Sequence, residues 1–172
     1  MKRLTLICPT ISRKTLSPLI ESALPQMKEG DEFIIISDGP FSPFAAATLH
    51  EYATAFPGLI RYMHLPERIG DYGCTPCDVA IARAKGDFIF FIGDDDTVAE
   101  GAFDAIREAV TDEPDRPHLF AMLHTGQVLE HSLDCGRVSG QQIVVPNVPS
   151  RIPCMADFPP GEQLVSDYHF IV

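Results

Sequence analysis

Four short apolar runs alternate, along the first two thirds of the chain, with segments whose apolar residues recur every three or four positions. The runs are rich in β-branched and aromatic residues, and glycine or polar residues bound them, as is typical of strands buried on both faces of a parallel sheet. We therefore expect strands over residues 4–8, 32–37, 59–64 and 88–93.

The segments between these runs predict helices. Leu16, Leu19 and Ile20 follow a helical spacing, and Pro18 is compatible with it only if the helix begins nearby. Gly86 is placed where a glycine commonly ends a helix. The expected helices lie within residues 15–27, where the helix ends by Pro25, and over 43–56, 76–86 and 98–110.

Strands that alternate with helices in this order predict an α/β fold, in which right-handed crossovers build a mostly parallel open sheet with helices on both faces. After the proline-bounded segment at 114–117 the strand-like pieces become shorter, at 118–123 and 141–146, and a proline-rich stretch follows at 146–160. We expect a single domain over residues 1–172, with a loop-rich second half from residue 111.

Composition narrows the class of protein. Apolar residues make up 45% of the chain and charged residues 22%, which is ordinary for a globular domain. The apolar runs are far shorter than the roughly 20 residues that a membrane-spanning helix needs, and the N-terminus lacks the apolar stretch of a signal peptide. Five irregularly spaced cysteines argue against a secreted disulfide framework. We expect reduced thiols in a cytoplasmic protein.

The negative net charge of the chain argues against nucleic-acid partners and affects how a diphosphate ligand could be bound. The net charge of −11 repels nucleic-acid phosphates, so strong nucleic-acid binding is not expected. A protein this acidic binds a diphosphate only with local positive charge, and a metal ion is a simple source of it. The sequence leaves open whether the chain forms a homo-oligomer.

Carboxylates gather directly after the expected strands, where ligands of open parallel sheets bind. Two carboxylates about 5 Å apart repel by roughly 3 kcal/mol at an effective dielectric near 20, so the run Asp94-Asp95-Asp96 predicts a Mg²⁺ or Mn²⁺ ion. If the backbone there stays extended, Asp94 and Asp96 share a face and Asp95 points away. Capping of a helix near Ala99 is the alternative for this run. The carboxylates in question are Asp38, Asp71, Asp94, Asp95 and Asp96.

Four segments together resemble a known family. They read "LTLICPTISRKTLSPLIESALPQ", "FIIISDG", "GDYGCTPCDVAIARAKGDFIFFIGDDD" and "SGQQIVVPN" followed later by "SDYHFI". The chain is similar, over nearly its whole length, to the inverting glycosyltransferases of family two, which have the GT-A fold of nucleotide-diphospho-sugar transferases. The resemblance implies a hexosyltransferase-like enzyme that uses a nucleotide sugar as donor, with a nucleotide-binding half over residues 1–110 and an acceptor-side half over 111–172.

The resemblance also implies roles for single residues. Pro9 and Thr10 would line the nucleoside pocket, and Asp38 would accept a hydrogen bond from the base. The acidic run matches the family's DXD motif, so that one of Asp94 and Asp95 meets the ribose. Asp71 joins this donor-binding set. The metal ligand would be Asp96 and the catalytic base Asp167, and His169 is a candidate third metal ligand or a residue that orients the base.

The sequence departs from the family pattern in two places, and two other functions remain open. Cys77-Asp78 stands where relatives commonly carry Arg-Asn, and Gly93 stands where the acidic motif often begins. A non-catalytic or decayed nucleotide-sugar-binding module is one alternative. A sugar nucleotidyltransferase is the other, although "PTISRKTLSP" lacks the glycines of its phosphate loop. The acceptor stays open as a glycan, lipid, protein or nucleobase. A thioredoxin or zinc site at Cys74 and Cys77 is disfavoured, because a second cysteine pair is missing.

Overall fold

A six-stranded sheet organises the computed structural model, which describes residues 1–124, 126–130, 140–152, 154 and 157. The strand order is β3-β2-β1-β4-β8-β5, in which the first three pairings are parallel and the two involving β8 are antiparallel. The expected mostly parallel α/β architecture is confirmed. The strands are β1 Leu4–Thr10, β2 Glu32–Ser37, β3 Ile60–His64, β4 Phe88–Phe91, β5 His118–Leu119 and β8 Ile143–Pro146.

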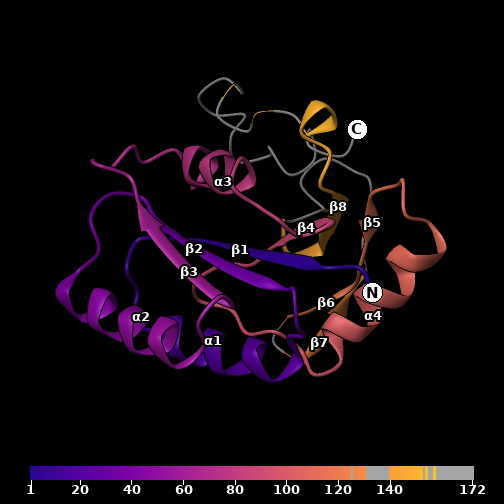
Figure 1. The fold of residues 1–172 in the computed structure, drawn as a ribbon, viewed down its shortest axis with the longest axis horizontal. Helices are drawn as coiled ribbons and strands as arrows, with labels where there is room; N and C mark the ends of the chain where they lie inside the picture. Colours follow the sequence, from indigo (N-terminus) through magenta and orange to yellow (C-terminus); the bar gives the residue numbers. More distant parts are fainter. Residues whose placement is uncertain (125, 131–139, 153, 155–156, 158–172) are drawn as a thin grey trace.

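Helices cover both faces of this sheet (Figure 1). Helices α1 (Leu16–Ala23), α2 (Pro43–Ala55) and α4 (Ala102–Asp112) pack on one face. Helix α3 (Cys74–Ile81) packs on the other. Alternate side chains of the same strands enter the two clusters, so β2 and β4 are buried along their whole length. This double burial is why their sequences are continuous apolar runs rather than alternating ones.

Two helices differ in extent from the sequence expectation. Helix α3 ends at Ile81 rather than at Gly86, because the amides of Arg83 and Ala84 bond three residues back, to the carbonyls of Ala80 and Ile81, in tight turns. Gly86 instead lies against β1, where an added Cβ would be 2.6 Å from Thr5 Oγ1 and 2.7 Å from the Thr5 backbone nitrogen. Helix α4 begins at Ala102, four residues later than expected from the pattern.

The expected start of the first helix near Pro18 and its end by Pro25 are confirmed, since α1 passes at Leu24 into a short 3₁₀ turn, η1 (Leu24–Gln26). Two further 3₁₀ turns, η2 (Gly140–Gln142) and η3 (Pro149–Arg151), flank β8. The expected strand at 118–123 is divided into β5 and β6 (Met122–His124), and β6 pairs with β7 (Gln127–Leu129) as a separate antiparallel hairpin.

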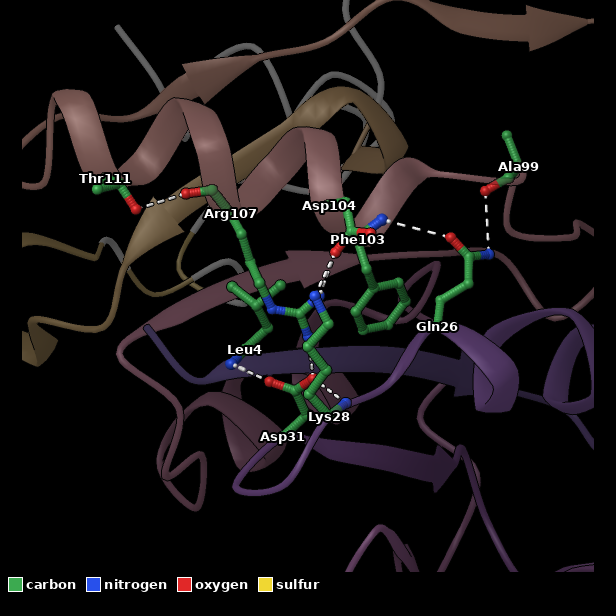
Figure 2. Close-up of polar contacts among 9 residues, drawn as sticks. All are labelled: Leu4, Gln26, Lys28, Asp31, Ala99, Phe103, Asp104, Arg107 and Thr111. Atoms are coloured by element: carbon green, nitrogen blue, oxygen red, sulfur yellow. Dashed lines mark hydrogen bonds and ion pairs between the residues drawn. The ribbon is translucent and has the colours of Figure 1, made fainter. Parts of the chain in front are cut away.

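A buried ion pair fixes α4 to the edge of the sheet at which the parallel strands begin (Figure 2). Asp31 precedes β2, and its carboxylate accepts from the guanidinium of Arg107. Its oxygens also accept from the backbone amides of Leu4 and Lys28, at 2.9 and 2.7 Å. The side chain of Asp31 is 1% exposed and that of Arg107 8%. The contact joins α4, β1 and the loop before β2.

None of the helices in the described part of the chain has the length and apolar character that a bilayer crossing requires.

Candidate functional site

Three strand ends and the segment before α3 surround one polar cavity of about 440 Å³ at the carboxyl edge of the parallel strands. The segments follow β1, β2 and β4, and their convergence is what the open-sheet rule predicts. Pro9, Thr10, Asp38, Asp94 and Asp95, which the sequence singled out, all line this cavity. Its remaining lining residues are Ile11, Arg13, Arg68, Gly70, Tyr72, Gly73 and Gly93.

The acidic run forms a turn rather than an extended strand end. The amide of Asp96 donates to the carbonyl of Gly93 at 3.2 Å. The condition for Asp94 and Asp96 to share a face is therefore not met, and the interactions confirm it: Asp94 and Asp95 both meet Arg13, whereas Asp96 meets Gln141. Capping of α4 by this run is also wrong, because its N-cap is Gly101, which has no side-chain cap.

Asp94 is the most enclosed carboxylate of the turn, at 4% exposed. The Thr10 hydroxyl donates to its Oδ2 at 2.6 Å, and the Ile11 amide reaches the same oxygen at 3.3 Å. Arg13 donates to its Oδ1 at 2.8 Å. Thr10 Oγ1 also accepts from the Ser12 amide at 2.8 Å. Asp94 therefore ties the loop after β1 to the acidic turn.

Positive charge comes to the cavity from two arginines. Arg13 Nη1 lies 2.7 Å from Asp95 Oδ2 and 2.8 Å from Asp94 Oδ1, and Arg68 also lines this cavity. Sequence reasoning gave neither arginine a role in binding, because neither belongs to a motif. The signal available was position alone: each arginine follows the end of a strand, β1 or β3, by three or four residues.

Asp38 and Asp71 organise the segment that leads into α3. The Asp38 carboxylate accepts from the amides of Ile69 and Gly70, at 2.7 and 2.9 Å. These partners are more than thirty residues away along the chain, so Asp38 does more than close a local turn. Asp71 Oδ2 accepts from the Thr75 amide at 2.8 Å, while its Oδ1 is buried without a hydrogen-bond partner among the described residues.

Asp96 lines a second cavity, of about 330 Å³. Gln141, which precedes β8, donates to Asp96 Oδ2 at 2.7 Å. The walls of this cavity are mostly apolar and come from β4, from α4 and from the segment around Phe120 and Met122. Asp96 thus lines a different cavity from Asp94 and Asp95, but the two cavities approach each other at Gly93, where a Cβ would lie 2.7 Å from Asp96 Oδ2 and 3.0 Å from Asp95 Oδ1.

Gly93 permits this compact arrangement. A Cβ at that position would be 2.7 Å from Asp96 Oδ2, 3.0 Å from Asp95 Oδ1 and 3.2 Å from Gln141 Nε2. The departure from the family pattern at this position therefore leaves room for two carboxylates beside the backbone.

Exposed apolar side chains stand at the rim of the polar cavity. Tyr72 is 71% exposed and has a backbone φ of 58°. Ile11 is 47% exposed. A left-handed backbone at a tyrosine costs energy, and such strained positions cluster at functional sites. The two side chains present apolar surface where the flat face of a ring could rest.

Three of the four cysteines in the described part of the chain are buried. Cys74 and Cys77 lie buried in the first turn of α3, and Cys8 is buried in β1. Burial raises the pKa of the Cys8 thiol well above its usual range, with the Asp94 charge adding to the effect, so this thiol stays protonated. Within the described ranges, no group of three or more His, Cys, Asp or Glu side chains could hold a metal ion.

Two of the residues assigned from the sequence, Asp167 and His169, lie outside the described residues.

Comparison with known proteins gives the family. The model of glycosyl transferase family 2 matches residues 5–117. Residues 1–349 of S. aureus TarS have a similar structure, with a TM-score of 0.73 at 15% identity over 99% of this chain and 55% of that one. No curated protein matches the sequence.

A mannosyltransferase gives a similar result. PcManGT from Pyrobaculum calidifontis, solved with GDP-Man and Mn²⁺, has a TM-score of 0.73 at 15% identity over 98% of this chain and 50% of its own. The chain thus spans about half the length of these two structures. At such identities the structures establish the shared GT-A fold alone, whereas the family model covers most of the chain, and on that match the chain belongs to glycosyl transferase family 2.

Proposed function

We propose that this chain transfers a sugar from a nucleoside diphosphate sugar to a hydroxyl group of an acceptor, with inversion at the anomeric carbon and with a divalent metal ion. The observation that carries the proposal is the polar cavity, in which two arginines and three aspartates meet at the carboxyl ends of the parallel strands. TarS has been solved with UDP, and PcManGT with GDP-Man.

The cavity offers separate surfaces for the parts of such a donor. Tyr72 and Ile11 supply apolar surface for the base, near the Asp38 carboxylate. Arg13 and Arg68 supply the positive charge that a diphosphate needs in a protein of net charge −11. Asp95, whose side chain is 60% exposed, remains able to accept from a ribose hydroxyl.

A Mg²⁺ or Mn²⁺ ion fits the residues in one way. These ions often use one or two protein carboxylates together with substrate phosphates, so Asp96 and the diphosphate oxygens would hold the metal without a larger cluster of side chains. The hydrogen bond from Gln141 orients the Asp96 carboxylate. When bound, the metal would stabilise the negative charge of the departing diphosphate.

Transfer needs a base for the acceptor hydroxyl, and Asp167 has that role in the proposal. The acceptor oxygen would attack the anomeric carbon, the bond from that carbon to the diphosphate would break, and the hydroxyl proton would pass to the Asp167 carboxylate. The acceptor's identity stays open among glycans, lipids, proteins and nucleobases.

Calorimetry with UDP and with GDP tests the donor site. We expect Mn²⁺ to strengthen binding of one of them to the wild-type chain, and we expect Asp96→Ala to lose that strengthening. Asp115→Ala is the matched control, because it removes an exposed carboxylate that does not line either cavity described above. Binding of equal strength with and without Mn²⁺ in the wild type would contradict the metal's role.

Turnover of the corresponding nucleotide sugar tests the enzyme assignment. Asp167→Asn should leave donor binding intact while lowering the rate of diphosphate release by about 10² or more, the usual contribution of a general base. Donor binding without any transfer or hydrolysis by the wild type would instead identify a non-catalytic nucleotide-sugar-binding module.

A further inference from the structure

Arg13 places a single guanidinium nitrogen against two carboxylates of the acidic turn. Its Nη1 lies 2.8 Å from Asp94 Oδ1 and 2.7 Å from Asp95 Oδ2. The two carboxylates differ in their surroundings, since the Asp94 side chain is 6% exposed and that of Asp95 60%. The guanidinium therefore connects an enclosed carboxylate to one that faces solvent.

The two contacts differ in how readily they can be exchanged. Asp94 is held by the Thr10 hydroxyl and the Ile11 amide in addition to Arg13, so its position does not depend on the guanidinium. Asp95 faces water, and an exposed ion pair of this kind typically contributes no more than about 1 kcal/mol. The contact between Arg13 and Asp95 is therefore the one that a stronger ligand can replace.

The position of Arg13 brings it within the same cavity as the proposed donor. Its side chain is 45% exposed and lines the cavity together with Arg68. A diphosphate attracts a guanidinium more strongly than a single solvated carboxylate does, because it carries more negative charge, while both kinds of group can bind an arginine through two hydrogen bonds. While it remains paired with the turn, the same guanidinium opposes any divalent cation that approaches these carboxylates.

We propose that Arg13 is a positioning residue that exchanges partners. In the donor-free protein it neutralises Asp95, and when a nucleoside diphosphate enters the cavity it turns to the phosphate oxygens and releases the negative charge of the turn to the metal ion. This exchange rests on the proposed function, because its ligand is the donor diphosphate. The pairing of Arg13 with Asp95 in the donor-free protein keeps the acidic turn from binding a free metal ion, and the exchange makes metal binding depend on the nucleotide.

Partner exchange predicts opposite effects of one substitution on two ligands. Arg13→Gln should bind Mn²⁺ alone more tightly and should bind metal-free UDP or GDP more weakly. Two unit charges roughly 5 Å apart in bulk water change an affinity by about fourfold. Mn²⁺ and a diphosphate each carry more than one unit of charge, so each effect should be at least about fourfold. Arg13→Lys keeps the charge on a long side chain and should restore both affinities toward the wild type.

Lys14→Gln is the matched control, since it makes the same change of net charge at the next, exposed position. Mn²⁺ binding is measured by electron paramagnetic resonance of the free ion, and nucleotide binding by calorimetry in a chelator. Thermal melts of all the variants verify that they fold, which we expect because the Arg13 side chain is nearly half exposed.

Each outcome decides between distinct roles. If Arg13→Gln weakens both ligands, Arg13 only braces the loop after β1, and partner exchange is wrong. If Arg13→Gln behaves like Lys14→Gln, its pairing has no influence on binding, and partner exchange is again wrong. If the wild type binds neither UDP nor GDP, with or without Mn²⁺, the proposed donor function fails and the exchange fails with it.

Discussion

Replacing Arg107 by methionine is expected to lower the free energy of unfolding by about 3 kcal/mol. Breaking a buried ion pair by removing one partner generally costs about 3–5 kcal/mol, because the other charge is left uncompensated. Here the remaining carboxylate of Asp31 is 1% exposed but keeps two backbone amide donors, from Leu4 and Lys28. Those donors place the expected loss at the lower end of the range.

Methionine preserves most of the apolar stem that crosses the core, so the substitution tests charge more than packing. Urea unfolding followed by circular dichroism suits a chain without tryptophan. With a slope of about 2 kcal/mol per molar urea, the midpoint should fall by roughly 1.5 M.

Arg116→Met is the control for this measurement. Arg116 lies 3.7 Å from Glu113 in a pair whose side chains are 75% and 60% exposed. Exposed pairs contribute little, so its midpoint should stay within the equivalent of about 0.5 kcal/mol of the wild type. A loss below about 1 kcal/mol for Arg107→Met, indistinguishable from the control, would refute the inference that this ion pair secures α4 to the sheet.

Three further predictions concern other positions. Gly86→Ala should lower the free energy of unfolding by about 2–3 kcal/mol, because the new Cβ meets backbone of β1 that cannot move aside; a melting temperature unchanged from the wild type would contradict this. Gly93→Ala should change stability by less than about 1 kcal/mol, because the new Cβ meets only side-chain ends, yet weaken the Mn²⁺-dependent nucleotide binding proposed for Asp96; unaltered calorimetric binding would contradict it. Arg3 holds the pKa of Asp87 below its ordinary value of about 3.9, so Asp87→Asn should be destabilising at neutral pH. A carboxyl whose pKa is lowered by folding stabilises the fold at a pH above its unfolded pKa, so the difference in stability between this variant and the wild type should shrink as the pH falls below that unfolded pKa. A difference that grows on acidification would be inconsistent with the pairing.

The strands of the parallel sheet could be predicted from the sequence because their pattern is local. Each run such as 32–37 or 88–91 is buried on both faces, and this burial leaves a continuous apolar signature that no distant contact alters. The position of the carboxylates followed from the same reasoning, since residues after parallel strands must meet at one edge.

The remaining features depend on contacts that no local pattern contains. Gly86 looks like a helix terminus in sequence, but its role is a close approach to Thr5, 81 residues earlier. The pairing of Arg13 with Asp94 spans a similar separation, and nothing in "PTISRK" marks that arginine as different from a solvated one. The direction in which each aspartate of the acidic run points depends on a turn that Gly93 permits, and this is a property of backbone geometry rather than of residue type.

The reversed direction of β8 determines which chemical group stands beside Asp96. Because β8 runs opposite to β4, its first residues lie at the edge where β4 ends, and this brings the Gln141 amide to the acidic turn. Asn147 follows the other end of β8, roughly 13 Å from the first residue of the strand, which is the length of four extended residues. The side-chain amide of Asn147 donates to the carbonyls of Ala84 and Gly86. If β8 had run parallel to β4, the positions of its two ends would be reversed. The Asn147 end of the strand would then lie beside the acidic turn, and the Gln141 end would lie near Ala84 and Gly86.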